Sequence, residues 1–422
     1  MRPYEIKIKM KKQNTKRQDL PSLRFSPSLK KLWRTRKFKT ILILIIFFSF
    51  FGLVENSQAA ELHVGSGQTY STIASAITAS SSGDTIYIHE GTYNEKSLVP
   101  KSGTDNANRT TLIRVTGENK PVIGAASYSD REATFNLNGH DNITLDGLVI
   151  NGSYGGNYDG AVVMGASDTV GGGGSSNNIT VQNCDLTASS VNVSQASTIR
   201  IGAGNSWINV LIYNCNIDGN FVCAGVRVNA TGAGSIGLNV LNNKFINSHI
   251  AVAFKWGDDI NRDINVENNI IQDSTQRSFT VDQSYVSITN NVIDTMASES
   301  AIGENWGGAN CTIIHNTIYV GGITSALSFR GFSNDNVYYD NIFYNPSTII
   351  DYGSNNTTGG HDNYSADPTF TDATSHDFTL ATGSGAIGTA SDSEDYGADL
   401  SLVGIDAGDE TPPSYPIGLS VE

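Results

Sequence analysis

Cysteine, proline and long apolar runs are all scarce in this sequence. Its 422 residues include only four cysteines (184, 215, 223 and 311) and ten prolines. Four cysteines are too few for a disulfide scaffold in an exported chain of this size. One apolar run, ILILIIFFSFFGLV (41–54), has 14 residues, whereas a transmembrane helix needs about 20. The composition therefore argues against a small disulfide-stabilised domain and against an ordinary membrane-spanning helix.

Residues 1–60 have the features of an export leader. Residues 1–40 contain 14 Lys and Arg residues and only two acidic residues, and the apolar run follows them. Small residues at Ser57 and Ala59 occupy the two positions that a signal peptidase reads. We therefore expect cleavage near Ala59 and a secreted or surface-attached protein. The alternative is that residues 41–54 remain as an uncleaved membrane anchor.

Positive charge is also scarce beyond this leader. From Glu61 onward there are 13 Lys and Arg residues against 38 Asp and Glu residues, a net charge of −25. Such a chain is unsuited to nucleic acid and to anionic membrane surfaces. It is also unsuited to a polyanionic glycan unless Ca²⁺ bridges the charges, because Asp-rich loops bind hard cations. The sequence identifies no definite cofactor, and Ca²⁺ with Asp258 and Asp259 as candidate ligands is the one ion that we consider.

One short phrase recurs along the chain: an alternating strand, an Asn pair and a further apolar residue. Examples are ITVQNCDL (179–186), INVENNII (264–271), VSITNNVIDT (286–295) and CTIIHNTI (311–318). The alternation has period two, which is typical of strands with one buried face. Successive pairs are separated by 37, 31, 28, 26, 22, 25 and 25 residues, with their first members at Asp146, Asn183, Asn214, Asn242, Asn268, Asn290, His315 and Asp340.

A repeat of about 25 residues holds three short strands and three bends, and such units stack into a parallel β-helix. Asn tolerates the left-handed backbone conformation of a tight bend, and its amide can hydrogen-bond along the stack. We therefore interpret the Asn pairs as structural. Cys184 and Cys215 fall in one column, either as buried thiols, which we favour, or as a disulfide.

The expected fold is all-β, a single-stranded right-handed parallel β-helix of about ten coils over residues 61–410. TYSTIASAITAS (69–80) predicts a short amphipathic capping helix with Ile73, Ala76 and Ile77 on its buried face. Residues 411–422 are rich in proline and predict a linker to a further module.

The segment GQTYSTIASAITASSSGDTIYIHEGTY (67–93), the Asn pairs and DPTF…DFTL…GSGAIG (367–388) resemble the bacterial right-handed parallel β-helix proteins of the pectin-lyase-like superfamily. The resemblance covers residues 61–410. It implies a monomer whose partner is an extracellular polysaccharide lying along one sheet. It implies no single activity, because the superfamily includes lyases, hydrolases, epimerases and non-catalytic surface proteins.

The strands between the Asn pairs collect five of the 13 cationic residues: Arg200, Arg227, Lys255, Arg277 and Arg330. A β-eliminating lyase needs a base for the C5 proton and a cation for the uronate carboxylate. We therefore predict that Lys255 is the base and Arg227 the carboxylate neutraliser. The predicted substrate-binding residues on the same face are Arg330, Asp282, Asn229, Asn305, Arg200 and Trp256.

Two observations keep a different interpretation open. Lys255 and Asp282 are neighbours in one column and form, in the alternative, only a surface ion pair. No complete catalytic motif is present, since FKWGDD (254–259) has Lys-Trp-Gly where the alginate and chondroitin lyases of this fold carry Arg-His-Gly. The sequence thus predicts a polysaccharide lyase or glycosidase. The alternative is a non-catalytic β-helix protein that binds glycans, adheres or supports a cell surface.

Overall fold

The structure is a computed structural model. It describes residues 59–405 except 130–131, 153–159, 166–173, 188–195, 203–205, 230–234, 256–261, 296, 304–307, 322–324, 330–334 and 353–358. The chain divides into two compact units, Met1–Gln58 and Ala59–Glu422. The first unit, and with it nearly all of the predicted leader, lies outside the described residues. Among the described residues, no helix is both long enough and apolar enough to cross a membrane.

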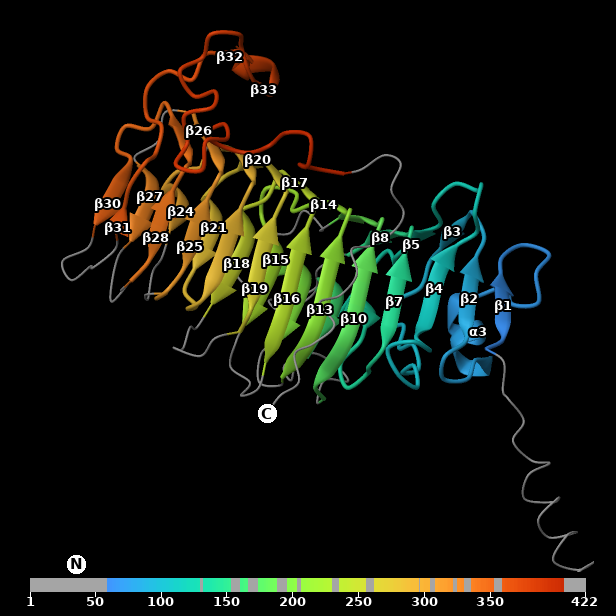
Figure 1. Cartoon of the computed structure of the whole chain (residues 1–422). Coiled ribbons are helices and arrows are strands. Elements are labelled where there is room, and N and C mark those ends of the chain that lie inside the picture. The colour runs from blue at the N-terminus through green and yellow to red at the C-terminus, as the bar shows by residue number, and fades with distance from the viewer. Residues whose placement is uncertain are drawn as a thin grey trace, which may run out of the picture. The chain divides into compact units, whose positions relative to one another are not determined.

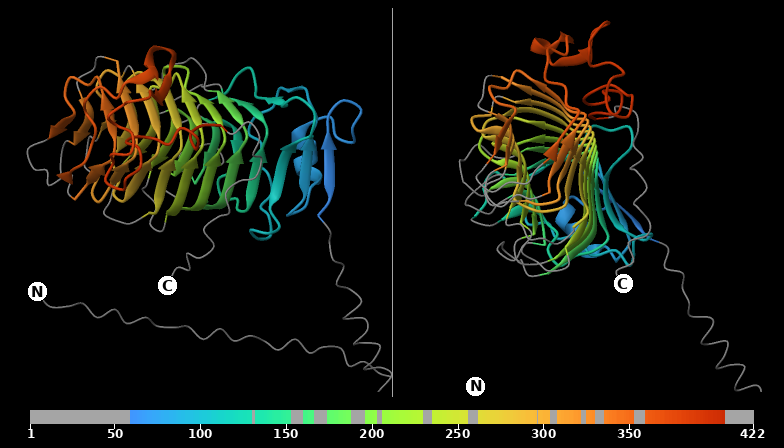
Figure 2. Two further views of the ribbon diagram at one scale, coloured as in Figure 1. Left: turned by 45° about the horizontal axis from the view of Figure 1, so that its top comes forward. Right: turned by 60° about the vertical axis from the view of Figure 1, so that its left-hand side comes forward.

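In the described part of the second unit, the strands form three parallel sheets, here called A, B and C (Figures 1 and 2). Sheet A contains twelve strands: β1 (Glu61–Val64), β2 (Thr85–Ile88), β4 (Thr110–Arg114), β7 (Ile143–Asp146), β10 (Ser176–Gln182), β13 (Trp207–Tyr213), β16 (Ile236–Leu241), β19 (Ile264–Glu267), β22 (Val286–Thr289), β25 (Thr312–Ile314), β28 (Val337–Tyr339) and β31 (Gly359–Gly360).

Sheet B contains ten described strands: β3 (Thr92–Tyr93), β5 (Val122–Ile123), β8 (Val149–Asn151), β11 (Asp185–Thr187), β14 (Asn216–Asp218), β17 (Lys244–Ile246), β20 (Ile270–Ser274), β23 (Val292–Thr295), β26 (Thr317–Val320) and β29 (Ile342–Tyr344). Sheet C contains nine described strands: β6 (Ala133–Asn136), β9 (Gly160–Met164), β12 (Ser197–Gly202), β15 (Ala224–Asn229), β18 (Ile250–Lys255), β21 (Arg277–Val281), β24 (Ser300–Gly303), β27 (Ser325–Phe329) and β30 (Ile350–Tyr352).

Strands that are neighbours in a sheet are mostly three elements apart in the chain. β10, for example, pairs in parallel with β7 and with β13, and Val181 stands opposite Leu145 on one side and Ile212 on the other. The chain therefore visits sheets A, B and C in turn and rises by one strand per turn. This order confirms the predicted parallel β-helix, and the strand numbers agree with the predicted count of about ten coils.

The Asn pairs form the bend between a strand of sheet A and the next strand of sheet B. From Asn183 onward the first member of each pair has a left-handed backbone, with φ of 54° at Asn183, 55° at Asn290 and 52° at His315. At the first bend it is the second member, Gly147, that has this conformation, with φ of 69°. The second members from Cys184 onward are buried inside the coil, and the Asn side chains from Asn243 to Asn341 stack. Asn291 Nδ2, for example, donates to Asn316 Oδ1 at 3.0 Å. The repeating phrase thus reflects a bend that only a few residue types can form.

The predicted capping helix is α3 (Ile73–Ala79), and Ile73, Ala76 and Ile77 are its buried residues as expected. Its first turn is held by the carboxylate of Glu95, which accepts hydrogen bonds from the backbone N–H of Ile73 at 2.8 Å and of Ala74 at 2.9 Å. A carboxylate at this end also interacts favourably with the helix dipole.

All four cysteines are buried, and none of them forms a disulfide. Cys184 Sγ donates to the carbonyl of Gln182 at 3.0 Å, and Cys215 Sγ donates to that of Tyr213 at 3.2 Å. The two thiols occupy equivalent positions one coil apart. The favoured interpretation as stacked thiols is confirmed, and the alternative of a disulfide between them is wrong.

Beyond the coils, β32 (Phe370–Asp372), the 3₁₀ turn Ala373–Ser375 and β33 (Asp377–Leu380) form a small antiparallel hairpin. The chain then turns back along the A–B bends, as the red segment of Figure 1 shows. We call residues 389–405 the C-terminal strap. Its position is fixed by hydrogen bonds such as that from Gly404 N to Asn268 O, at 2.8 Å.

Candidate functional site

The predicted columns of sheet C are present in the structure. The register pairs Arg200 with Arg227 and Asn229 with Lys255. Asp282 follows β21, and its backbone N–H donates to Phe254 O at 3.0 Å, which places Asp282 one coil beyond Lys255. These residues are therefore brought together by strand register alone.

Lys255 and Asp282 form an ion pair. The distance from Lys255 Nζ to Asp282 Oδ2 is 3.4 Å, and the two side chains are 15% and 0% exposed. The pair that the alternative interpretation expected is thus present, but it is buried rather than on the surface. Breaking a buried pair from one side leaves the other charge uncompensated, so the pair constrains both side chains more than a surface pair would.

The expectation of an open outward face on sheet C is wrong for the described residues. Every residue of β12 is buried, and Arg200 and Asn229 are both 0% exposed. Of the five described candidates, only Arg227 and Lys255 retain accessible surface. The physical reason is that these strands are covered on both faces, and the alternation of side chains could not indicate that second cover.

The environment of Lys255 favours its neutral form. Burial is the main cause that lowers its pKa below 10.5. Asp282 opposes this effect, whereas the positive charges of Arg227 and Arg277 add to it. Arg277, whose side chain is 4% exposed, is itself paired with the carboxylate of Glu299. A lysine whose pKa is depressed in this way is suited to act as a base.

Several polar atoms near Lys255 have no hydrogen-bond partner among the described residues. They include both amide atoms of Asn229, the hydroxyl of Thr280 and Oε1 of Gln283. The amide nitrogen of Gln283 donates to Lys255 O at 3.2 Å. A buried polar atom without a partner is costly, so such a group is an indication of a functional site.

The remaining predicted site residues cannot be compared with the structure. Trp256, Asp258, Asp259, Asn305 and Arg330 lie outside the described residues. The predicted Ca²⁺ ligands are among them.

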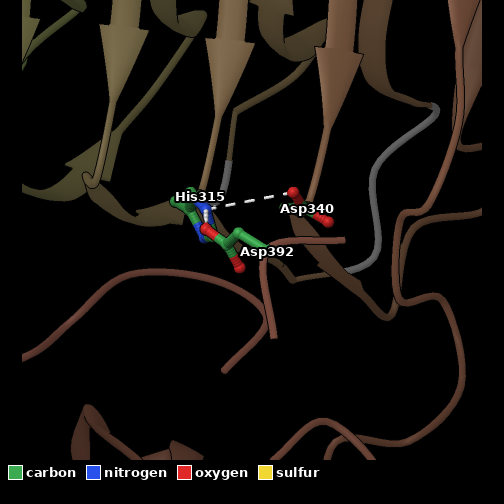
Figure 3. A group of neighbouring side chains, drawn as sticks. All are labelled: His315, Asp340 and Asp392. Carbon is green, nitrogen blue, oxygen red and sulfur yellow. Dashed lines mark hydrogen bonds and ion pairs between the residues drawn. The ribbon is translucent and has the colours of Figure 1, made fainter. Parts of the chain in front are cut away.

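A second cluster of functional side chains was not predicted from the sequence. His315 and Asp340, from two neighbouring A–B bends, face Asp392 of the C-terminal strap (Figure 3). His315 Nε2 lies 2.9 Å from Asp392 Oδ2 and 3.9 Å from Asp340 Oδ2. The signal in the sequence was that His315 and Asp340 replace Asn at two successive bends. Their partner on the strap is distant in sequence, so no local pattern could reveal it.

A cavity of about 640 Å³ lies beside this cluster, between the strap and the A–B bends. It is lined by His315, by apolar and aromatic side chains such as Phe378 and Tyr396, and by five carboxylates: Glu267, Asp392, Glu394, Asp395 and Asp399. None of its described lining residues is Lys or Arg. The cavity therefore has a strongly negative potential.

No protein-family model matches this chain, and neither does any curated protein. Several solved structures are similar to it. Pectate lyase Pel9A is 12% identical, with 81% of this chain and 97% of that chain covered at a TM-score of 0.46. The PL6 family polysaccharide lyase Pedsa3628 from Pseudopedobacter saltans is 11% identical, with 82% and 99% covered at 0.43.

A third similar structure, PfbA, is described as a surface adhesin of Streptococcus pneumoniae. It is 13% identical, with 68% of this chain and 86% of that chain covered at a TM-score of 0.36. Similarities at this level assign no activity to the chain. The fold rests on the chain's own strand order, which is the parallel β-helix that the resemblance to the pectin-lyase-like superfamily implied.

Proposed function

We propose that this protein acts on an extracellular, uronate-containing polysaccharide and cleaves it by β-elimination. Lys255 is the base and Arg227 neutralises the uronate carboxylate. The observation that carries the proposal is a largely buried lysine with a depressed pKa, one coil from an arginine that retains accessible surface. Export after removal of the leader brings the protein to its substrate.

The reaction uses two features of this arrangement. Arg227 binds the carboxylate at C5, which makes the C5 proton more acidic and stabilises the developing enolate. The neutral amine of Lys255 takes that proton, the bond from C4 to the glycosidic oxygen breaks, and a C4=C5 double bond forms. The departing oxygen takes up a proton from water to become a hydroxyl group, and the Lys255 ammonium ion then returns its proton to the solvent, so atoms and charges balance.

The fully buried residues support these two groups and do not contact the sugar. Asp282 fixes the position of the Lys255 amine and stabilises the ammonium ion that forms when the base accepts its proton. Asn229 stands beside Lys255 in the register and offers an amide with no described partner. Arg200 adds positive potential from the next coil behind Arg227.

The test is the ultraviolet absorbance of the unsaturated uronate product. The purified protein is incubated with alginate, pectate, chondroitin and rhamnogalacturonan, each with and without Ca²⁺. We expect absorbance to rise with at least one substrate, and Lys255→Met to abolish the rise. Lys244→Met is the matched control, because Lys244 lies on β17 of sheet B and is also partly buried.

A glycosidase would release new reducing ends without the change in absorbance, which would overturn the assignment of Lys255 as an eliminating base. Absence of both signals favours the second candidate function, a non-catalytic glycan-binding or structural β-helix. One observation supports this candidate: Lys255 is only 15% exposed and is already held by Asp282.

A further inference from the structure

The C-terminal strap follows the A–B bends in the direction opposite to the rise of the coils. Gly397 N donates to Asp340 O at 3.0 Å, and Ala398 N donates to Thr317 Oγ1 at 3.0 Å. Further along the strap, the side-chain amide of Asn242 donates to Leu402 O at 3.1 Å. The strap thus forms hydrogen bonds with several successive A–B bends.

The contact at His315, Asp340 and Asp392 differs from the others because it brings three metal-binding side chains together. Nε2 of the imidazole and one oxygen of each carboxylate all lie within 4.8 Å of one another. Two ligand atoms of a tetrahedral ion at about 2.1 Å from each are about 3.4 Å apart. The separations of 2.9 Å and 3.9 Å from His315 Nε2 lie on either side of this value, and the two carboxylate oxygens lie within 4.8 Å of each other.

The remaining adjustment falls on the most exposed of the three side chains. The Asp392 side chain is 48% exposed, whereas that of Asp340 is 1% exposed. Asp340 is held by the strap itself, because Ser391 N donates to its Oδ1 at 2.8 Å and the Ser391 hydroxyl donates to its Oδ2. Hydrogen bonds of this kind orient metal-binding carboxylates in protein sites.

The charge around the cluster also favours a bound cation. Five carboxylates line the adjoining cavity, and no Lys or Arg is among its described lining residues. Bringing the acidic strap against the acidic bends therefore costs electrostatic free energy that the single imidazole of His315 cannot balance. A divalent ion between His315 and the carboxylates offsets that repulsion.

We propose that His315, Asp340 and Asp392 bind a divalent transition-metal ion, with Zn²⁺ the best match, and that this ion fastens the C-terminal strap to the β-helix. One imidazole and two carboxylates form a donor set that suits Zn²⁺ and leaves one position for water. Ca²⁺ fits less well, because it takes six to eight oxygen ligands. The site is independent of the sheet C residues and of the activity proposed for them.

The test measures Zn²⁺ binding by equilibrium dialysis of the full chain. The first variant is His315→Asn, which should fold because Asn is the usual residue at this bend and His315 has the same left-handed backbone, with φ of 52°. The second is Asp392→Asn on the exposed strap. The control is His361→Asn, since the His361 side chain is 60% exposed and its ring pairs with its neighbour Asp362 and stacks on Tyr339, away from the three proposed ligands.

We expect the wild-type chain and His361→Asn to bind Zn²⁺ equally, and His315→Asn and Asp392→Asn to bind it about tenfold more weakly or worse. We also expect Zn²⁺ to slow proteolysis within residues 389–405 of the wild type and to have no such effect on His315→Asn. The proposal is overturned if wild type and His315→Asn bind Zn²⁺ alike, if neither binds, or if bound Zn²⁺ leaves cleavage of the strap unchanged.

Discussion

The chemistry of a single side chain, Lys255, determines what the sheet C site can do. Its amine lies between one negative neighbour, Asp282, and two positive ones, Arg227 and Arg277, in a largely buried position. Burial and the two arginines lower its pKa, and Asp282 raises it. The balance makes the neutral amine available at lower pH than for an exposed lysine.

Two substitutions should therefore move the pKa of Lys255 in opposite directions. Arg227→Met removes a positive charge that disfavours the ammonium form, so the pKa should rise. Asp282→Asn removes the negative charge that favours it, so the pKa should fall. The deprotonated amine is the form that reacts with acetic anhydride. Acetylation of Lys255, followed by mass spectrometry of peptides across a pH series, should begin at higher pH in Arg227→Met and at lower pH in Asp282→Asn.

Acetylation of Lys244 in the same samples is the internal control, because Lys244 lies on β17 of sheet B and should keep one profile throughout. A shift of both variants in the same direction would mean that a general loosening of the fold, and not the local charges, sets the reactivity of Lys255.

Single residues also show where prediction from the sequence ends. Strand alternation correctly placed Arg227 and Lys255 in neighbouring columns, because register follows from the repeat. It could not show that Arg200 and Asn229 are buried, since alternation gives the face on which a side chain lies and not what packs against that face. The His315–Asp392 contact could not be predicted either, because its members are 77 residues apart.

At the scale of structural elements, the stack of buried Asn side chains at the A–B bends contributes most clearly to stability. We call this column, from Asn243 to Asn341, the inner stack. Asn291 Nδ2 donates to the carbonyls of Val266 and Thr289, at 3.0 Å each, and to Asn316 Oδ1. Its own Oδ1 accepts two hydrogen bonds from Asn269. One side chain thus satisfies buried backbone groups in adjacent coils.

Asn291→Ala should be strongly destabilising, because it leaves several of these buried groups without partners. At about 1–3 kcal/mol for an unsatisfied buried group, we expect the free energy of unfolding to fall by roughly 2–4 kcal/mol. Asn265→Ala is the control, since the hydrogen bond from Asn265 to Asn239 is exposed, and it should cost less than about 0.5 kcal/mol. Urea unfolding followed by circular dichroism measures both. Equal losses would show that the inner stack has no special role.

A second prediction concerns the packing of the C-terminal strap against the A–B bends. Gly397 has φ of +80°, and an added Cβ would lie 2.5 Å from Thr317 Oγ1 and 2.8 Å from Ile342 Cδ1. Gly397→Ala should therefore lift the strap from the bends and increase its cleavage by protease. Gly383→Ala is the matched control, because Gly383 has φ of +90° and no atom within 4 Å of an added Cβ.

Both alanine variants bear a similar backbone cost of about 1 kcal/mol for the left-handed conformation. Only the clash distinguishes them. Cleavage rates within residues 389–405, followed by mass spectrometry, should rise in Gly397→Ala alone. A rise in both variants, or in neither, would mean that this contact does not hold the strap in place.

For the whole molecule, the structure of the repeating coils could be predicted from the sequence, whereas the position of the C-terminal strap could not. The period-two strands and the Asn bends specify each coil locally, so the parallel β-helix follows from the repeat without further information. The strap breaks the repeat, and its position depends on bends that precede it in sequence by up to 160 residues. The cavity under the strap is a consequence of such long-range packing.

The net charge of −25 from Glu61 onward should govern the rate of encounter with an acidic glycan. The long-range field repels a polyanion, and salt screens it over about 8 Å at physiological ionic strength. Stopped-flow association rates with an oligouronate should therefore rise as salt is added. A rate that falls with added salt, as for a basic protein binding nucleic acid, would show that local positive charge dominates the approach.

The most direct test of the account is the dissociation constant for an oligouronate and for its carboxyl-reduced, neutral counterpart, measured by calorimetry on wild type and Arg227→Met. A charge-assisted hydrogen bond contributes about 1.5–3 kcal/mol. The account predicts that the wild type binds the acidic form about tenfold more tightly or better, and that Arg227→Met loses this preference. Equal binding of both forms by the wild type, or a preference unchanged in Arg227→Met, would contradict it.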